Sequence, residues 1–377
     1  MSPGRLALLA AAMAGGLAAA QAAGCRDTPR GAIGVALPLG GPLSEWGREA
    51  REGLELAFSR AAPPAPRVVW EDSRGTPDGA MAAMERLVDQ GATLVVGPFT
   101  TDEAVAAATL ASSLGVPLVV PAATGAGVSE PGGWAVRLCY EDAEAARALA
   151  EWAASDARLQ RMALVIDLES AYSLGLAEAF RHAYVRLGGR IVGEVAYRGG
   201  RDDRAQVLGR VAALDIQGAL VAGYAPDIVA MFEAPETDEL RARLAQLVLL
   251  GGDGWNGAGL REAMAGRVAG AYHTRHFDPS AQEPQVVEFL ADWRELHASE
   301  PTDAGALGYD AGLAARAVFD PDLDGAALLE RLRALHDLAG VTGPITIGAA
   351  GSALRKPVVL VRVDQAPGAQ VVARLVR

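Results

Sequence analysis

Apolar residues recur along this chain in short continuous runs, and each run is followed by a segment whose apolar positions repeat at helical spacing. A continuous apolar run bounded by turn residues is typical of a strand buried on both faces. Helices between such runs indicate a parallel sheet covered by helices. The first series predicts strands at 33–39, 68–71, 94–97 and 118–120 and helices at 44–61, 77–90 and 101–114.

The pattern starts again in the middle of the chain. Two series of this kind predict an α/β protein with two doubly wound, Rossmann-like lobes joined by a multi-strand hinge. We expect the first lobe at 31–141 plus 274–346 and the second at 142–273 plus 347–377, because the tail crosses back to complete both. The second series predicts strands at 163–166, 190–197, 219–222 and 247–250 and helices at 172–187, at 205–213 and from 226. The tail predicts a strand at 268–273, helices at 284–297, 304–318 and 325–338, and strands near 346, at 358–363 and at 371–375.

The charge of the chain argues against one class of partner. The 377 residues include 34 Lys and Arg against 46 Asp and Glu, which gives a formal net charge of −12. A general nucleic-acid binder carries a basic stripe or patch, and no run of Lys and Arg here is longer than two residues. We therefore expect no nucleic acid as a partner.

Residues 1–24 have the pattern of a signal peptide for export. Residues 6–20 form an apolar stretch rich in Ala and Leu that is too short for a membrane span. Two cleavage sites fit the small residues that follow. One is an A-x-A site at 20–22, and the other is a lipobox-like sequence that would leave Cys25 as a lipidated first residue. A lipobox usually has Leu three places before the Cys, where this chain has Ala22.

The second cysteine, Cys139, lies in a strand-like run at 134–140. Two interpretations stay open for it. It could form a disulfide with Cys25 in an oxidising compartment, or it could be a small buried apolar residue.

Small and polar residues follow the predicted strands, at the ends where doubly wound sheets bind ligands. Either Thr101 or Asp102 is positioned to cap a helix, and the free N–H groups and positive dipole end there suit a carboxylate. Thr124 offers a hydroxyl within a loop of small residues that lets a ligand approach the backbone. Asp253 follows two glycines at a strand end and could receive an ammonium group. An ordinary cap, loop or turn also explains each of these features.

Eight short fragments stand in the order of one protein family. On these fragments the chain resembles the type I periplasmic solute-binding proteins of the branched-chain amino-acid ABC transporter family, from Gly31 to the C-terminus. The resemblance implies the type I periplasmic binding protein fold and a small-molecule ligand, an amino acid, held between the lobes. It also implies a periplasmic location, an inner-membrane ABC permease as partner, a monomer, and no cofactor. The fragments are Ile33-Gly34-Val35 with Gly40-Gly41-Pro42, Ser44-Glu45-Trp46-Gly47, Gly97-Pro98 followed by Thr100-Thr101, Pro121-Ala122-Ala123-Thr124, Tyr172-Ser173-Leu174-Gly175, Gly223-Tyr224-Ala225-Pro226, Gly252-Asp253-Gly254 and Gly308-Tyr309-Asp310-Ala311.

The resemblance implies a set of ligand-binding residues. Thr101 matches the hydroxyl residue that binds the ligand carboxylate, and Asp253 matches the acid that neutralises the α-ammonium group. Ala122 and Thr124 match the loop that binds both ends of the amino acid, Ala122 through its backbone carbonyl. The neighbours Thr100 and Ala123 belong to the same two loops, and the aromatic positions that line the pocket or the closed cleft are Trp46, Tyr172 and Tyr224.

Two positions depart from that family. Relatives that bind leucine or isoleucine carry Glu where this chain has Asp253. Because Asp is one methylene shorter, the lobes must close further or a water must intervene. Five residues before Tyr309, the family often has an aromatic residue, and this chain has Ala304, which implies a roomier pocket.

The sequence offers no pattern for catalysis. It lacks a G-x-S-x-G elbow, a G-x-x-x-x-G-K phosphate loop and an H-E-x-x-H sequence. His273 and His276 are three residues apart, and on a strand this spacing puts them on opposite faces, so we expect no metal site. A periplasmic sensor or an activator of an envelope enzyme with the same fold is the alternative to a transport receptor. A DNA-binding regulator would need a helix pair at the N-terminus, where this chain has a signal sequence.

Overall fold

The computed structural model describes residues 31–61, 65–130, 133–156, 158–198, 203–233, 237–257, 268, 270–363 and 369–375. The predicted signal peptide and Cys25 lie outside the described residues. Within these ranges no helix combines the length and the apolar character needed to cross a membrane.

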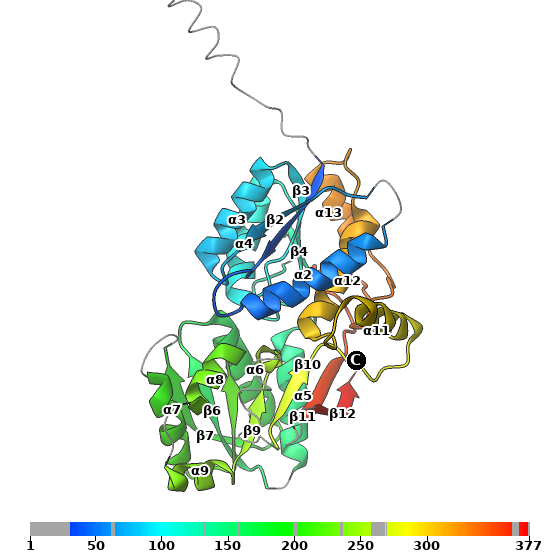
Figure 1. Cartoon of the computed structure of the whole chain (residues 1–377). Coiled ribbons are helices and arrows are strands. Elements are labelled where there is room, and N and C mark those ends of the chain that lie inside the picture. Colours follow the sequence, from blue (N-terminus) through cyan, green and yellow to red (C-terminus); the bar gives the residue numbers. More distant parts are fainter. Residues whose placement is uncertain are drawn as a thin grey trace, which may run out of the picture.

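Two sheets divide the elements into two lobes, drawn one above the other in Figure 1. The first sheet has the order β2-β1-β3-β4-β5 and is parallel throughout. The second has the order β12-β11-β10-β9-β8-β6-β7, and it is parallel from β7 to β10 and antiparallel at β11 and β12. The predicted α/β class with two doubly wound lobes is confirmed. The strands are β1 Ala32–Leu37, β2 Val68–Asp72, β3 Ala92–Val96, β4 Leu118–Val120, β5 Ala135–Arg137, β6 Arg161–Asp167, β7 Arg190–Tyr197, β8 Gly218–Ala222, β9 Val248–Gly251, β10 Tyr272–Arg275, β11 Val358–Val363 and β12 Ala369–Leu375.

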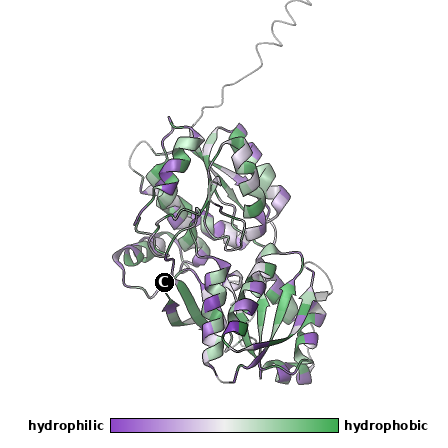
Figure 2. Ribbon diagram, turned by 180° about the vertical axis from the view of Figure 1, so that it is seen from behind, coloured by the Kyte–Doolittle hydropathy of each residue, from purple (hydrophilic) through white to green (hydrophobic). Residues whose placement is uncertain are grey.

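Helices cover the faces of both sheets, and their outward sides carry the hydrophilic residues while the strands are mostly hydrophobic (Figure 2). This distribution is expected for strands buried on both faces. The helices of the first lobe are α2 Ser44–Ser59, α3 Pro77–Asp89, α4 Thr101–Leu114, α11 Pro284–Leu296, α12 Asp303–Val318 and α13 Gly325–Arg333. Those of the second lobe are α5 Asp142–Ser155, α6 Ala171–Arg186, α7 Asp203–Ala212, α8 Ala225–Glu233, α9 Asp238–Leu244 and the 3₁₀ turn η1 Asp253–Trp255.

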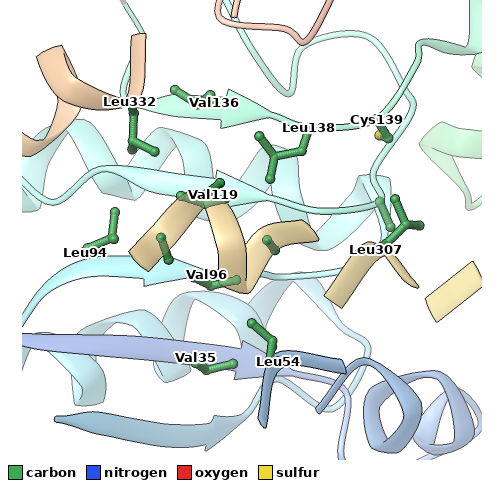
Figure 3. Close-up of a cluster of buried hydrophobic side chains, with 14 of the residues drawn as sticks. Val35, Leu54, Leu94, Val96, Val119, Val136, Leu138, Cys139, Leu307 and Leu332 are labelled. Atoms are coloured by element: carbon green, nitrogen blue, oxygen red, sulfur yellow. The ribbon is translucent and has the colours of Figure 1, made fainter. Parts of the chain in front are cut away.

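The core of the first lobe has two sides, because successive residues of a strand point to opposite faces. On β3, Leu94 and Val96 join a buried cluster with residues of α2, α12 and α13. Between them, Val95 joins the cluster formed with α3 and α4. Figure 3 shows the first cluster, with Val119 of β4 and Leu307 of α12 among its side chains.

The chain passes between the lobes after β5, after β10 and before β11. Arg137 at the end of β5 pairs with Ser352 of the returning segment as an isolated bridge. Ile347 and Ala353 of that segment pack in the core of the first lobe, whereas β10 belongs to the second sheet as far as Arg275. These connections form the hinge between the two sheets.

Candidate functional site

A cleft with an empty volume of about 420 Å³ lies between the lobes. Both lobes and one of the hinge segments line it, and every residue predicted to bind a ligand is in it except Thr100. Its walls are thus built from strand ends and helix starts of both sheets. The residues that line it are Trp46, Phe99, Thr101, Ala122, Ala123, Thr124, Tyr172, Tyr224, Asp253, Asn256, Gly257, His276, Thr302, Asp303, Ala304 and Leu307.

Asp253 follows β9 and begins η1, so its carboxylate faces the cleft from the second lobe. The Tyr172 hydroxyl donates a hydrogen bond of 3.0 Å to its Oδ1, and Nε2 of His276 lies 3.2 Å from its Oδ2. The Gly254 N–H donates to the Tyr172 hydroxyl at 2.9 Å. The acid is therefore held in one orientation by two side chains.

Glycine is required beside this acid because the backbone approaches Tyr172 closely. A Cβ atom at Gly252 would lie 2.3 Å from the Tyr172 hydroxyl oxygen. A Cβ atom at Gly254 would lie 2.6 Å from the Gly223 carbonyl oxygen. Both distances are too short for any side chain, so the Gly-Asp-Gly sequence lets the acid and the tyrosine meet.

Three aromatic rings meet across the cleft. The rings of Tyr172 and Tyr224 stack with their centroids 4.8 Å apart. Trp46 of the first lobe meets Tyr224 edge-on, with centroids 5.8 Å apart and an interplanar angle of 83°. Burial and the charge of Asp253 raise the pKa of Tyr172, and burial and the charge of Asp102 raise that of Tyr224. Both phenols therefore stay protonated and can act as hydrogen-bond donors.

Thr101 is the first residue of α4 and faces the cleft, with the positive end of that helix behind it. Its hydroxyl oxygen accepts a hydrogen bond of 3.0 Å from the Gly125 N–H, which leaves the hydroxyl hydrogen free to be donated. Its own N–H donates to the Tyr224 hydroxyl oxygen at 3.3 Å. This geometry suits an anionic group better than a cation.

Thr100 is the N-cap of α4, in place of the predicted Thr101 or Asp102, and it does not line the cleft. Its hydroxyl accepts from the Glu103 N–H at 3.4 Å and its own backbone N–H donates to Oε2 of Glu103 at 3.2 Å, which forms a capping box. Its side chain is buried. Thr100 therefore fixes where α4 begins, and this places Thr101 in the cleft.

The loop after β4 presents Ala122, Ala123 and Thr124 to the cleft. The buried Arg137 guanidinium donates to the carbonyl oxygens of Ala123 and Gly125 at 3.2 and 2.7 Å. The Asp142 N–H donates to the Thr124 carbonyl oxygen at 2.9 Å. The Ala122 carbonyl accepts no hydrogen bond from the described residues. The loop is thus rigid, and one acceptor in it is left for a ligand.

His276 is a cleft residue that the sequence did not identify as one. Its ring stacks on Tyr140 with centroids 4.0 Å apart. Its backbone N–H donates to Oδ2 of Asp303 at 2.6 Å. The neighbouring Arg275 donates to Oδ1 of Asp303 through Nε at 2.9 Å and Nη2 at 2.7 Å. His273 lies apart from it, beside Trp255. No group of three or more His, Cys, Asp and Glu side chains in the described ranges could hold a metal ion.

No local sequence pattern indicates this arrangement. Arg275 ends β10, His276 follows it, and Asp303, 28 residues after Arg275, begins α12. Only the return of the chain through the hinge makes them neighbours. The other lining residues that were not predicted are Phe99, Asn256, Gly257, Thr302, Asp303 and Leu307.

The charge inside the cleft is negative. None of the lining side chains is Lys or Arg, and the carboxylate of Asp303 is paired with Arg275. In the part of the chain that the structure describes, no Lys or Arg pairs with Asp253, whose Oδ2 lies 3.2 Å from Nε2 of His276. The cleft is therefore suited to a ligand that brings its own positive charge to Asp253.

Two carboxyl groups lie behind the lining residues and are raised in pKa. Burial and the charge of Asp253 together raise the pKa of Asp142 to about 8, against the opposing effects of the Thr124 hydroxyl and Arg137. Burial raises the pKa of Glu49 to about 7, against the hydrogen bond donated by Thr302. Asp142 is thus mostly protonated near neutral pH and adds little negative charge to the cleft.

Direct contacts between the lobes show that the cleft is closed. Trp46 Nε1 donates to the Asn256 carbonyl oxygen at 2.6 Å. At the rim, Oδ1 of Asp102 accepts from the Ala171 N–H at 2.7 Å. A solute in the cleft would be surrounded by both lobes at once.

The model of the periplasmic binding protein family matches residues 32–369 of this chain. The chain belongs to this family. Among curated periplasmic binding proteins, it is 28% identical over 231 residues to the Leu/Ile/Val-binding protein BraC3 of Rhizobium johnstonii, which covers 59% of this chain and 61% of that protein. It is 33% identical over 172 residues to the Leu/Ile/Val-binding protein homolog 3 of Brucella melitensis, which covers 44% of this chain and 46% of that protein. These alignments thus span less than two thirds of either relative.

Solved structures of periplasmic binding proteins match nearly the whole fold. A leucine binding protein of Thermotoga maritima MSB8 superposes with a TM-score of 0.83 and 26% identity, over 91% of this chain and 98% of that one. A branched-chain amino acid transporter substrate binding protein of Streptococcus pneumoniae, solved with isoleucine, gives a TM-score of 0.81 at 24% identity, over 92% and 99%. The predicted resemblance to periplasmic binding proteins of type I is confirmed.

Proposed function

We propose that this chain is the extracytoplasmic solute-binding component of an ABC importer and that it captures an amino acid in the closed cleft. One observation carries the proposal: the cleft sets Asp253, an acid with no Lys or Arg partner among the described residues, opposite hydroxyl and helix-start groups of the other lobe. An amino acid has an ammonium and a carboxylate on neighbouring atoms, so it matches both ends. Such a ligand would connect the lobes, and its binding would favour the closed state.

In this proposal the ligand carboxylate is bound by the first lobe. Thr101 donates its hydroxyl hydrogen, and the Thr124 hydroxyl and the start of α4 add favourable polar groups. The ligand ammonium is bound by Asp253 and by the free carbonyl oxygen of Ala122. Trp46 and Tyr224 enclose the side chain of the ligand. Hydrogen bonds to charged groups contribute about 1.5–3 kcal/mol each, and micromolar affinity needs about 8 kcal/mol, so several of these contacts must act together.

Two features of this structure accompany the short side chain of Asp253. Tyr172 and His276 hold its carboxylate from two sides, and the lobes touch directly through Trp46 and Asn256. Both features support close approach of the lobes around a small ligand. Ala304 lines the cleft with only a methyl group, which leaves room for a larger ligand side chain.

The family also supports a location outside the cytoplasm. We propose that residues in the range 1–24 direct export, that Cys25 is either the lipidated first residue or, after cleavage at the A-x-A site, an unmodified residue near the new N-terminus, and that an inner-membrane permease receives the ligand from a monomer. We propose no enzymatic activity and no cofactor for the chain, in line with solute-binding relatives.

A thermal-shift screen over the twenty amino acids and small carboxylates tests the proposal. A ligand that binds only the folded protein raises its melting temperature by mass action. Calorimetry with the best ligand should then show binding to the wild type and none to Asp253→Ala, whose ligand-free melting temperature should stay within a few degrees. An unchanged affinity would refute the role of Asp253. A lack of any shift with all amino acids would favour a sensor or an activator of an envelope enzyme.

A further inference from the structure

The lobes meet at a second place, outside the residues that line the cleft. Asp102, the second residue of α4, extends its carboxylate to the start of α6 in the other lobe. Its Oδ1 accepts from the Ala171 N–H at 2.7 Å, and its Oδ2 accepts from the Ser170 hydroxyl at 3.3 Å. None of these three residues lines the cleft. The contact can therefore be changed without touching a ligand.

The start of α6 is a favourable place for a carboxylate. Ala171 is the first residue of a helix of 16 residues, so its N–H has no acceptor within the helix. Ser170 is the N-cap, and its hydroxyl oxygen already accepts from the Ser173 N–H at 3.3 Å. The positive end of the helix dipole adds to the attraction. Closing the lobes thus places a negative charge of one lobe at the positive end of a helix in the other.

We propose that Asp102 is a positioning residue for solute capture, a latch between α4 and α6 that stabilises the closed lobes and slows release of the ligand. The measurement of release rests on the proposed function, whereas lobe closure itself is tested without ligand. The latch exists only when the lobes are closed. Its loss therefore speeds opening and leaves the association rate nearly unchanged.

The latch lies next to the ligand-binding end of α4 but is separate from it. Thr101 precedes Asp102 directly, and its N–H donates to the Tyr224 hydroxyl oxygen. Trp46 and Tyr224 also connect the lobes, but both line the cleft, so their substitution changes ligand contacts as well. Among the bridging side chains described, Asp102 allows closure and ligand contact to be separated.

The first experiment compares Asp102→Asn with Asp78→Asn. Asp78 is the second residue of α3, as Asp102 is of α4, and it is exposed. Both substitutions remove a favourable charge from the first turn of their own helix, but only Asp102 contacts the second lobe. With L-leucine as the probe, stopped-flow tryptophan fluorescence should show release about tenfold faster for Asp102→Asn and unchanged for Asp78→Asn. Equal release rates in the two variants would overturn the latch.

A second variant acts from the other lobe. Ser170→Asp keeps a good N-cap for α6 but places a like charge beside Asp102, so release should again be faster. In the double variant Ser170→Asp with Asp102→Asn this repulsion is absent. The double variant should therefore release leucine more slowly than Ser170→Asp alone, which a merely structural role for either residue does not predict.

A third measurement needs no ligand. Hydrogen exchange of the Ala171 amide, followed by NMR in the ligand-free protein, should be faster in Asp102→Asn than in the wild type and in Asp78→Asn. If leucine does not bind the wild type, the proposed ligand is wrong, and the exchange rates still decide the latch. Equal exchange in all three proteins would then overturn it.

Discussion

The hydroxyl of Tyr172 lies between Asp253 and the backbone that carries it. It donates to Oδ1 of Asp253 at 3.0 Å and accepts from the Gly254 N–H at 2.9 Å. It can do so because Gly252 has no side chain; a Cβ there would lie 2.3 Å from the phenol oxygen. The orientation of the Asp253 carboxylate in the cleft thus depends on Gly252 having no Cβ atom.

Gly252→Ala should therefore weaken ligand binding without changing any ligand contact directly. The added methyl group also meets Leu176 Cδ2 at 2.5 Å, so Tyr172 must move and Asp253 loses its donor. We expect a loss of about 1–3 kcal/mol in the free energy of unfolding and at least tenfold weaker binding, measured by denaturation and calorimetry. Gly209→Ala is the control, because a Cβ there has no atom within 4 Å in the exposed face of α7. Normal affinity in Gly252→Ala would contradict the argument.

The adjacent threonines at the start of α4 should respond differently to substitution. Thr101→Val removes the hydroxyl that faces the cleft, and we expect binding to weaken by about tenfold, whereas Thr101→Ser keeps the hydroxyl and should bind nearly normally. Thr100→Ala removes the N-cap, so it should cost about 1 kcal/mol of stability with affinity within threefold. Calorimetry and urea denaturation of the three variants test this. Equal loss of affinity in Thr101→Val and Thr101→Ser would indicate packing and not the hydroxyl.

The helix that carries these threonines was predicted with its observed bounds, Thr101–Leu114, because both ends are encoded locally. Thr100 and Glu103 form a capping box at its start, and Gly115 ends it in the left-handed region with φ of 64°. By contrast, α5 at Asp142–Ser155 was not predicted. Its buried positions are mostly alanine, so its apolar face hardly differs from its exposed face in the sequence.

The predicted strand at 268–273 is observed as β10, Tyr272–Arg275. Its last two residues are polar, yet both are buried, because Arg275 pairs with Asp303 across the hinge. The same long-range contact puts His276 into the cleft. Residues at strand ends, such as Asp253 and Thr124, could be placed from the order of the elements alone. Residues of the hinge could not, because their neighbours are fixed only when the chain returns between the lobes.

The largest ligand side chain that the cleft can accept should depend on Ala304 in α12. This residue lines the cleft beside Leu307 and is buried. Ala304→Phe would fill space that the wild type leaves to the ligand. In Ala304→Phe, the affinity for the smaller ligands should stay within about threefold of the wild-type value, and the affinity for the largest should fall by tenfold or more. The thermal-shift screen measures both. A uniform loss for all ligands would indicate damage to the cleft and not selection by size.

Asp142 should make the stability of the protein depend on pH. Burial and the charge of Asp253 raise its pKa to about 8, whereas an Asp in an unfolded chain titrates near about 4. Between these values the folded protein holds a proton that the unfolded chain has released, so the stability that Asp142 contributes is lost as pH rises through this window. The slope from this group is at most about 1.4 kcal/mol per pH unit.

Asp142→Asn removes this titration and keeps the size of the side chain. Urea denaturation of both proteins at pH 5, 6, 7 and 8 should therefore show the variant gaining stability relative to the wild type at each step. Glu49, with its pKa raised to about 7 by burial, titrates in both proteins and cancels in the difference. Parallel curves across the four pH values would show that Asp142 is ionised throughout, and a negative charge would then have to be counted behind Thr124 in any account of ligand binding.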